Sequence, residues 1–264
     1  MKDIIKMEKI STPYIFHNFN LNIKENSFVT IVGTNNSGKT TLVKILSGLS
    51  KYEGYINVDS YLLNDFHLSK IRNKISFVFD DINANFVSET VKDDLVFSLE
   101  NLQLNKEEIT KKLEKIVKIF NLENYLELSP YNLSNSMKQK LAIANALIHE
   151  PKILVLDDCI NQLNIKDRKE IFKILKKYQK EGLTIIMTTR NLEDSLYCDR
   201  IVVLDKGEII LDNEPLKIYK EDKKLNKLKI KKPFIIELSQ NLMLYNLIEE
   251  EYTDFGKLVD AIWR

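Results

Sequence analysis

The stretch IVGTNNSGKTTL, residues 31–42, decides the fold class of this chain of 264 residues. Within it, residues 33–40 follow the pattern G-x-x-x-x-G-K-[ST], in which backbone N–H groups at a helix start surround a phosphate. The apolar run FVTIVG (28–33) before it predicts a buried strand, and the residues from Lys39 onward predict a helix. A strand, a phosphate-binding loop and a helix in this order predict an α/β P-loop NTPase.

The phosphate loop supplies most of the predicted nucleotide ligands. Lys39 is expected to reach the β- and γ-phosphates of ATP, and Thr40 is expected to hold Mg²⁺. Asn36 is unusual, because a backbone position that needs a positive φ prefers glycine, yet asparagine tolerates that conformation better than most residues. We therefore expect nucleotide binding to survive. The full predicted set in this segment is Gly33, Thr34, Asn35, Asn36, Ser37, Gly38, Lys39, Thr40 and Thr41.

The composition limits the function classes. The formal net charge is only +1 although 29% of residues are charged, which argues against a nucleic-acid binder with a large basic field. Two cysteines form neither a disulfide framework nor a zinc site. No window of about 18 apolar residues occurs, so the sequence predicts no membrane span. Only seven residues are glycine, which makes a missing glycine weak evidence for altered function.

Several apolar runs with β-branched residues follow the loop at intervals. They are continuous rather than alternating, so most read as strands buried on both faces of a parallel sheet. The last run contains the turn signal Asp205-Lys206-Gly207 and predicts a hairpin at the sheet edge. The runs are ISFVFD (75–80), KILVLDD (152–158), LTIIMTT (183–189) and RIVVLDKGEII (200–210).

Helical patterns separate these strands. Residues 105–120 place apolar side chains on one face, with Asn105 as a cap and Glu108 three residues later. Residues 82–147 show helical patterns and no convincing strand, which predicts a helical subdomain inserted into an ATP-binding domain of residues 1–220. Residues 221–264 predict a charged, solvated linker and a small C-terminal helical appendage.

A second element of the nucleotide site is Asp157, which ends the apolar run from residue 153 to residue 156. A carboxylate at the end of a buried strand helps to organise the Mg²⁺ of a bound nucleotide, directly or through water. Taken with the phosphate loop, this aspartate is predicted to share the metal with Thr40.

The order of motifs resembles that of the ATP-binding subunits of ABC transporters. LSNSMKQKLAIANAL (133–147) takes the place of the signature helix, LVLDDCINQLN (154–164) that of Walker B and the D-loop, and TIIMTTRNLEDS (184–195) that of the switch histidine. The segment VFDDINANFVSETVKDDLVFSLENL (78–102) is most similar to the energy-coupling factor importers of vitamins and cobalt. The chain lacks the N-K-x-D element expected of a GTPase.

The resemblance implies a fold and partners. It implies a RecA-like mixed sheet flanked by helices, with an N-terminal antiparallel β portion. It further implies a dimer with a second ABC ATPase, joined through the C-terminal appendage and bound to a membrane coupling subunit and a substrate-binding membrane subunit. The chain is then expected at the cytoplasmic face of the cell membrane without crossing it. The transported solute is not encoded here.

Several functional positions depart from the family pattern. Asp80 replaces the Q-loop glutamine, Asp158 the catalytic glutamate and Arg190 the switch histidine. Asn164 replaces the D-loop aspartate. The signature LSGGQ, which in the family faces the nucleotide of the partner chain, reads Leu133 followed by Ser134, Asn135, Ser136 and Met137.

Each catalytic departure leaves two interpretations open. Asp158 is one methylene shorter than glutamate and is expected to hold the attacking water poorly, unless the site repositions it; general-base assistance contributes about 10²- to 10⁴-fold in rate. Arg190 either clamps the γ-phosphate, without relaying a proton, or points away as a surface arginine. Asp80 either approaches Mg²⁺ or is a solvated loop carboxylate.

The signature and the adenine platform are similarly open. Ser134 is expected to cap the helix that begins there, whereas Asn135 and Ser136 bring Cβ atoms where glycine permits close approach. Tyr14 is the candidate to stack on adenine, although Ile10 lies as near to the expected position and Tyr14 also fits a core aromatic.

The sequence predicts the ATP-binding subunit of an ABC-type, energy-coupling factor-like importer that binds MgATP and hydrolyses it slowly. The alternative is a degenerate ATP-binding partner that completes an asymmetric ATPase heterodimer while hydrolysis takes place elsewhere. A homodimer would combine Asp158, Arg190 and the altered signature at both composite sites, which favours pairing with a related but intact chain.

Overall fold

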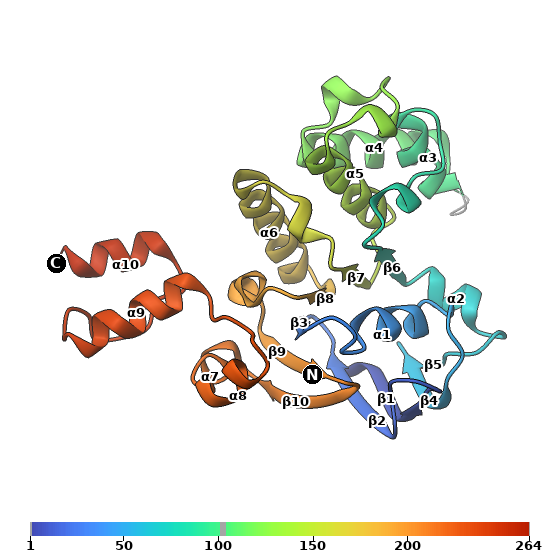
Figure 1. Ribbon diagram of the computed structural model, residues 1–264. Helices are drawn as coiled ribbons and strands as arrows, with labels where there is room; N and C mark the ends of the chain where they lie inside the picture. Colours follow the sequence, from blue (N-terminus) through green and yellow to red (C-terminus); the bar gives the residue numbers. More distant parts are fainter. Residues whose placement is uncertain (1, 101–103, 264) are drawn as a thin grey trace.

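The centre of the fold is a six-stranded sheet in the order β10-β9-β3-β8-β7-β6 (Figure 1). The computed structural model describes residues 2–100 and 104–263, so residues 1, 101–103 and 264 of the predicted domains lie outside the described part. All neighbours in this sheet are parallel except β9 and β10. The strands are β3 (Phe28–Gly33), β6 (Ile75–Val78), β7 (Ile153–Asp157), β8 (Thr184–Thr189), β9 (Arg200–Asp205) and β10 (Glu208–Asn213).

An antiparallel sheet lies beside the central sheet, and its order is β2-β1-β4-β5. Helix α1 (Lys39–Leu46) packs between the two sheets, where its buried residues join one hydrophobic core. This confirms the predicted N-terminal antiparallel portion and the helix start at Lys39. The strands of this second sheet are β1 (Asp3–Ser11), β2 (Phe19–Lys24), β4 (Glu53–Val58) and β5 (Tyr61–Leu62).

The strands of the central sheet are buried on both faces, which explains their continuous apolar sequences. In β7, Ile153 and Val155 enter the core shared with α1, whereas Leu154 and Leu156 enter a second, larger core. Helix α6 (Ile165–Lys180) and the helical subdomain cover that second face. Alternate residues therefore serve different cores, and no polar position is needed in the strand.

The inserted helical subdomain is confirmed between β6 and β7 (Figure 1). It has no strand in its described residues, as the sequence predicts. Its helices pack through the larger core, with α5 contacting α3 and α4. They are η1 (Ile82–Asn85), α3 (Val91–Glu100), α4 (Lys106–Phe120), η2 (Glu123–Tyr125), η3 (Pro130–Asn132) and α5 (Asn135–Leu147), where η marks a 3₁₀ helix.

The predicted edge hairpin is confirmed by the antiparallel pair β9 and β10. Its turn residues Lys206 and Gly207 both have positive φ, 47° and 82°, as a tight turn that matches the strand twist requires. The remaining short helices are α2 (Leu68–Arg72), η4 (Ile160–Gln162), η5 (Leu192–Tyr197) and α7 (Pro215–Ile218).

The charged segment after Tyr219 is not a solvated linker, contrary to the prediction from its composition. It forms α8 (Asp222–Lys227), and Leu225 and Ile230 are buried in the larger core. The many lysines of this segment obscured the spacing of its two buried apolar residues in the sequence. The C-terminal appendage follows as α9 (Phe234–Leu244) and α10 (Phe255–Ile262), which extend to one side of the molecule (Figure 1). None of the helices in the described residues is long and apolar enough to cross a bilayer.

Helix α4 begins with the predicted capping box. The Asn105 side chain accepts a hydrogen bond from the Glu108 N–H at 2.9 Å, and Glu108 Oε2 accepts one from the Asn105 N–H at 3.0 Å. We expect Asn105→Ala to lower the free energy of unfolding by about 1 kcal/mol, because the Glu108 N–H loses its side-chain acceptor. Urea unfolding followed by circular dichroism measures this. Lys111→Ala, on the exposed face of α4, is the control and should change stability by less than about 0.5 kcal/mol; equal effects would contradict the role of the cap.

Candidate functional site

The loop between β3 and α1 curls around the Lys39 side chain. The Lys39 ammonium donates hydrogen bonds to the carbonyl oxygens of Gly33 at 2.6 Å and Thr34 at 2.9 Å. It is almost fully buried, and burial lowers its pKa, while Asp158 opposes that effect. A cation held at the centre of a ring of backbone groups is suited to bind an anion that enters the loop.

The backbone conformation at two positions of this loop explains which residue types occur there. A Cβ on Gly33 would lie 2.5 Å from the Leu204 carbonyl oxygen of the neighbouring strand, so only glycine fits there. Asn36 adopts φ 62°, in the left-handed region. Asparagine reaches this conformation at small cost, so the loop keeps its shape without a glycine at residue 36.

Asp157 lies beneath the loop at the carboxyl end of β7. It pairs in register with Thr188 of β8, and the Thr188 hydroxyl donates a hydrogen bond to Asp157 Oδ1 at 2.5 Å. Its other oxygen, Oδ2, is buried and makes no hydrogen bond of normal geometry within the described part of the chain. Burial raises the pKa of Asp157; the Thr188 hydroxyl lowers it, Asp80 raises it and the Thr40 hydroxyl lowers it.

This orphaned oxygen fits a divalent cation. A buried carboxylate oxygen without a donor is costly unless a positive group approaches it, and Mg²⁺ prefers oxygen ligands supplied in part by phosphates. Among the described residues, no three His, Cys, Asp or Glu side chains gather to hold a metal by themselves. The donor set of Thr40 and Asp157 therefore suits a metal that arrives with a phosphate rather than a resident one.

Asp158 and Arg190 form an ion pair at the mouth of the site. Arg190 Nε lies 2.7 Å from Asp158 Oδ2, and Arg190 Nη1 lies 3.5 Å from Asn35 Oδ1 in the phosphate loop. Asn161 donates a hydrogen bond to the other Asp158 oxygen. Arg190 is thus not a surface arginine that points away, because it links the loops after β7 and β8 to the phosphate loop.

These residues line one cavity of about 430 Å³. Exposed Asp80 reaches it from the segment after β6, so it is a loop carboxylate that faces the cavity. The lining consists of Asn35, Asn36, Ser37, Gly38, Lys39, Thr40, Thr41, Asp80, Asp158 and Arg190. The carboxyl ends of parallel strands thus bring together residues that are far apart in sequence.

The signature residues lie outside this cavity, at the start of α5. Ser134 caps the helix, and its hydroxyl accepts a hydrogen bond from the Met137 N–H at 3.3 Å. Asn135 is exposed, whereas Ser136 donates a hydrogen bond to Asp167 of α6. The structure therefore does not bring residues 134–137 to the phosphate loop of the same chain.

Tyr14 is not a core aromatic, and this part of the sequence interpretation is wrong. Its side chain is 94% exposed, whereas Ile10 is fully buried in β1. Tyr14 lies on a loop whose next residues, Ile15 and Phe16, pack against Gly38 of the phosphate loop. A short loop with polar turn residues holds the ring outside the core.

Sequence reasoning missed Thr188 and Asn161, which position the two acidic residues. Thr188 ends a buried apolar strand, and such a polar residue at a carboxyl end is a signal that the sequence contains. Asn161 carries no comparable signal in the sequence. Its hydrogen bond to Asp158 depends on the turn that begins at Asp158, where the backbone has φ 46°.

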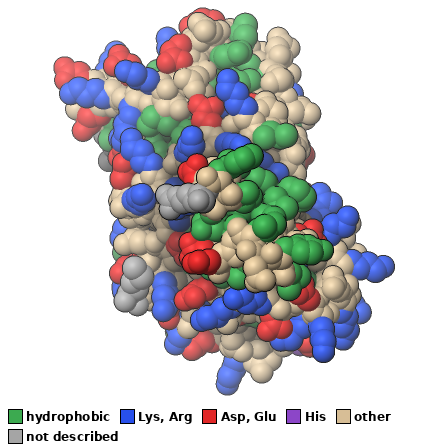
Figure 2. Space-filling view, turned by 90° about the vertical axis from the view of Figure 1, so that its left-hand side faces the viewer, with side chains coloured by type: hydrophobic (Ala, Val, Ile, Leu, Met, Phe, Trp, Pro, Cys, Tyr) green, Lys and Arg blue, Asp and Glu red, His purple; other side chains and the backbone are tan. Residues whose placement is uncertain are grey.

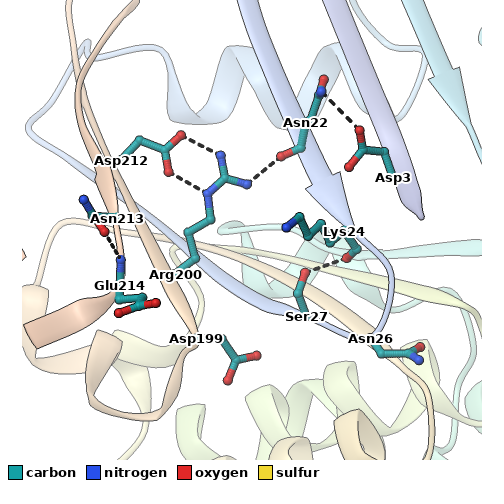
Figure 3. A pocket seen from close by; sticks show the side chains of 10 residues that line it. All are labelled: Asp3, Asn22, Lys24, Asn26, Ser27, Asp199, Arg200, Asp212, Asn213 and Glu214. Atoms are coloured by element: carbon teal, nitrogen blue, oxygen red, sulfur yellow. Dashed lines mark hydrogen bonds and ion pairs between the residues drawn. The ribbon is translucent and has the colours of Figure 1, made fainter. Parts of the chain in front are cut away.

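A larger cavity, of about 700 Å³, lies elsewhere, at the amino ends of β3 and β9 (Figure 3). Arg200 pairs with Asp212 and donates a hydrogen bond to the Asn22 carbonyl oxygen. Asn22 in turn donates to Asp3. Of its described lining residues, none holds a buried polar side-chain atom without a partner. The Arg200 and Asp212 charges of this cavity are therefore already paired with each other, whereas Asp157 keeps an unpartnered oxygen.

Comparisons with known proteins point to one family. A family model described as "ABC transporter" matches residues 16–161. The energy-coupling factor transporter ATP-binding protein EcfA1 of Oenococcus oeni is 33% identical and covers 94% of this chain and 90% of its own length. EcfA1 of Mesomycoplasma hyopneumoniae is 34% identical over 95% of this chain and 91% of its own length.

Solved structures agree with the sequence relatives. cbiO1 from Clostridium perfringens, part of the ABC transporter complex cbiONQ, superimposes with a TM-score of 0.77, is 31% identical and covers 86% of this chain and 94% of its own. A dimeric ATP-binding cassette in a post-hydrolysis state with ADP and Pi gives a TM-score of 0.73 at 30% identity, covering 80% of this chain and 98% of its own. The fold predicted from the sequence is confirmed.

The buried carboxylate of Asp157 should cost stability in the absence of a metal. Its pKa is raised on folding, so its contribution to stability is full below the unfolded pKa and falls as the pH rises toward the folded value. We expect Asp157→Asn to raise the melting temperature of the nucleotide-free chain at pH 7 by about 2–4 °C, corresponding to about 1 kcal/mol. The same variant should lose the additional thermal stabilisation by MgATP.

Scanning calorimetry at several pH values measures both effects. Asp158→Asn is the matched control, because Asp158 is paired with a half-exposed arginine, and it should raise the melting temperature by less than about 1 °C. A nucleotide-free Asp157→Asn chain no more stable than wild type would show that the Asp157 carboxylate is not strained.

Proposed function

This chain belongs to the ABC transporter family of ATP-binding proteins, and on that premise we propose that it is the ATP-binding subunit of an energy-coupling factor-type importer with weakened hydrolysis. The orphaned Asp157 oxygen beside Thr40, under a loop closed around Lys39, is the observation that carries the proposal. ATP with Mg²⁺ is the ligand that suits this set, since the metal would supply the positive charge that the unpartnered Asp157 oxygen lacks.

Different residues of the site are proposed to bind the phosphates and the metal. Lys39 exchanges the Gly33 and Thr34 carbonyl oxygens for phosphate oxygens, and the N–H groups at the start of α1 face the same anion. Thr40 and Asp157 would hold the metal, which would supply positive charge against the phosphates. Asp80 lines the same cavity, near enough to Asp157 to add to the effect of burial, which raises the pKa of that carboxyl.

Tyr14 supplies the base platform in this proposal. An almost fully exposed aromatic ring on a loop that packs against Gly38 is available to stack on adenine. Ile10, the alternative in the sequence, is fully buried in β1 and has no free face.

Asp158 is the expected base for the attacking water, and its contacts favour slow turnover. Its carboxylate is shorter than the glutamate of the family pattern, and Arg190 and Asn161 already occupy its oxygens. Because both oxygens already hold hydrogen-bond or ion-pair partners, neither is free to accept a proton from water, so general-base assistance is reduced. Arg190 carries a fixed charge and cannot pass on the proton.

The second candidate function is an ATP-binding partner in an asymmetric heterodimer, with hydrolysis at the other composite site. Ser136 favours it, because its hydroxyl donates to Asp167 within its own chain instead of facing outward from the signature. Asn135 and Ser136 also add side chains where the family pattern has glycine, so a partner's nucleotide would be held loosely.

The C-terminal appendage is proposed as the contact with a second ATPase chain. Hydrophobic side chains gather on the face that α9 and α10 present in Figure 2. Isolated exposed apolar residues are common, but a gathered set marks an interface. The exposed members are Phe234, Leu244, Tyr245, Leu247, Phe255, Val259, Ile262 and Trp263. A membrane coupling subunit and a substrate-binding membrane subunit would complete the importer at the cytoplasmic face of the membrane.

ATP hydrolysis by the purified chain tests the weakened site. Asp158→Glu combined with Arg190→His should raise the rate at least about tenfold, because the longer carboxylate is then free to act as base. Asp158→Glu alone should gain less, since Arg190 still pairs with the carboxylate. Asp212→Glu, in the remote cavity of Figure 3, is the control and should change nothing. A fast wild-type chain that gains nothing from the double substitution would refute weakened hydrolysis.

Association of the chain tests the appendage. Leu244→Asp with Trp263→Ser should weaken MgATP-dependent association at least about tenfold, because charge and lost apolar area oppose burial of that face. Sedimentation velocity with and without MgATP measures this. Phe66→Ser removes an equally exposed ring elsewhere and should leave association unchanged; the reverse pattern would place the contact away from the appendage.

A further inference from the structure

Asp167 contacts the first turns of two helices. It lies in the first turn of α6, where its N–H donates a hydrogen bond to the Asn164 side chain at 2.9 Å. Its carboxylate reaches the first turn of α5, where the Ser136 hydroxyl donates to Oδ2 at 2.5 Å. Residues 135–138 of that turn include no Asp or Glu. Asp167 therefore supplies the negative charge that the amino end of a helix attracts.

The direction of the hydrogen bond between Ser136 and Asp167 is fixed by the other contacts of this carboxylate. Burial raises the pKa of Asp167, but the Lys140 ammonium, 2.6 Å from Oδ1, and the Ser136 hydroxyl hold it below the usual range. The carboxyl is ionised at neutral pH and can only accept. The Asn164 amide approaches the Ser136 oxygen as a donor, at 3.4 Å. The Ser136 proton is therefore directed at Asp167.

A hydroxyl whose proton is already donated is a poor partner for an anion. Serine has one O–H donor, so the Ser136 oxygen presents only lone pairs to any further group. Phosphate oxygens are acceptors as well, so the two cannot form a hydrogen bond. Ser136 is half-buried and follows the exposed Ser134 and Asn135. It thus lies at the surface where, in the proposed function, the signature meets the nucleotide of a second chain.

Glu170 shows that the contact matters here and not the charge of the cluster as a whole. Its carboxylate lies 2.9 Å from the same Lys140 ammonium, but it accepts a hydrogen bond from Asn121 and none from Ser136. Two carboxylates therefore share one buried lysine, and only that of Asp167 accepts the serine proton. This difference supplies a matched control within the same cluster.

We propose that Asp167 is a positioning residue that withholds the Ser136 proton from the phosphates of a nucleotide bound to a second chain. This chain is then a weak second half for the ATP site of its partner. The inference rests on the proposed function, because it concerns the nucleotide that a second ATPase chain brings to the signature. The effect is one-sided, since the nucleotide in this chain's own phosphate loop meets the partner's signature. No covalent bond forms or breaks.

Association of the chain in the presence of the β,γ-imido analogue of ATP with Mg²⁺, measured by sedimentation velocity, tests this role without hydrolysis. Asp167→Asn should tighten association at least about threefold, because the new amide can donate to the Ser136 oxygen and leave the serine proton for a phosphate. Ser136→Ala should not weaken association, because the wild-type hydroxyl gives nothing to the nucleotide of the second chain. Glu170→Gln is the control and should leave association unchanged.

A double substitution separates the hydroxyl from simple loss of charge. In the Ser136→Ala background, Asp167→Asn should change association by less than about twofold, because no serine proton remains to be released. Circular dichroism and the affinity of the dilute single chain for MgADP should match wild type in every variant, which shows that the fold and the phosphate loop are intact. If Asp167→Asn does not fold, the sign of the Ser136→Ala effect decides.

Four results would overturn the role of Asp167 while leaving the ATP site in place. They are an Asp167→Asn chain without a gain, an equal gain in Glu170→Gln or in the Ser136→Ala background, a Ser136→Ala chain that associates about tenfold more weakly, and a chain that binds the analogue but stays monomeric in every variant. A wild-type chain that binds no nucleotide would overturn the proposed function itself.

Discussion

The hydrogen bond from the Thr188 hydroxyl to the Asp157 carboxylate is the contact on which the site depends. It joins the carboxyl ends of β7 and β8 inside a sheet whose two faces are covered, so the strand ends have little freedom. The loops that carry Asp158 and Arg190 leave directly from these ends, and their ion pair follows from the same register. Because the residues around this buried contact are closely packed, the order of the strands determines where the side chains at their ends lie.

Much of the fold could be predicted because its local signals agree with its tertiary structure. Strands buried on both faces give continuous apolar runs, and the Asn105 cap marks a helix start without reference to the rest of the chain. The phosphate loop and Asp157 were found in the same way. Features that depend only on neighbouring residues can be predicted from the sequence of that segment alone.

The rest could not be predicted, because it depends on contacts between distant segments. Nothing in the order of residues shows that the segment after β8 meets the segment after β7, so the partner of Arg190 was left open. Tyr14 was ambiguous for a related reason, since an aromatic residue fits a core as well as a loop. Leu225 and Ile230 were hidden because lysines surround them and only the folded chain shows that α8 packs.

The departures in the signature and the D-loop also meet in the structure. Asp167 accepts hydrogen bonds from the side chains of Ser136 and Asn164, and the buried Lys140 lies 2.6 Å from it. Burial alone would raise the pKa of Asp167, but Lys140 and Ser136 hold it below the usual range. The start of α5 is thereby fixed to the start of α6, so these substitutions form one polar cluster instead of separate losses.

The left-handed backbone conformation of Asn36 recurs at other asparagines of the chain. Asparagines also take the left-handed backbone conformation at Asn18, Asn26, Asn121 and Asn246, positions where a turn or helix end needs it. A glycine gives up more conformational entropy on folding than any other residue, and an asparagine gives up less. Turns with asparagine at these positions have fewer backbone conformations in the unfolded chain. A phosphate loop of this kind therefore loses less conformational entropy when it becomes ordered around its ligand.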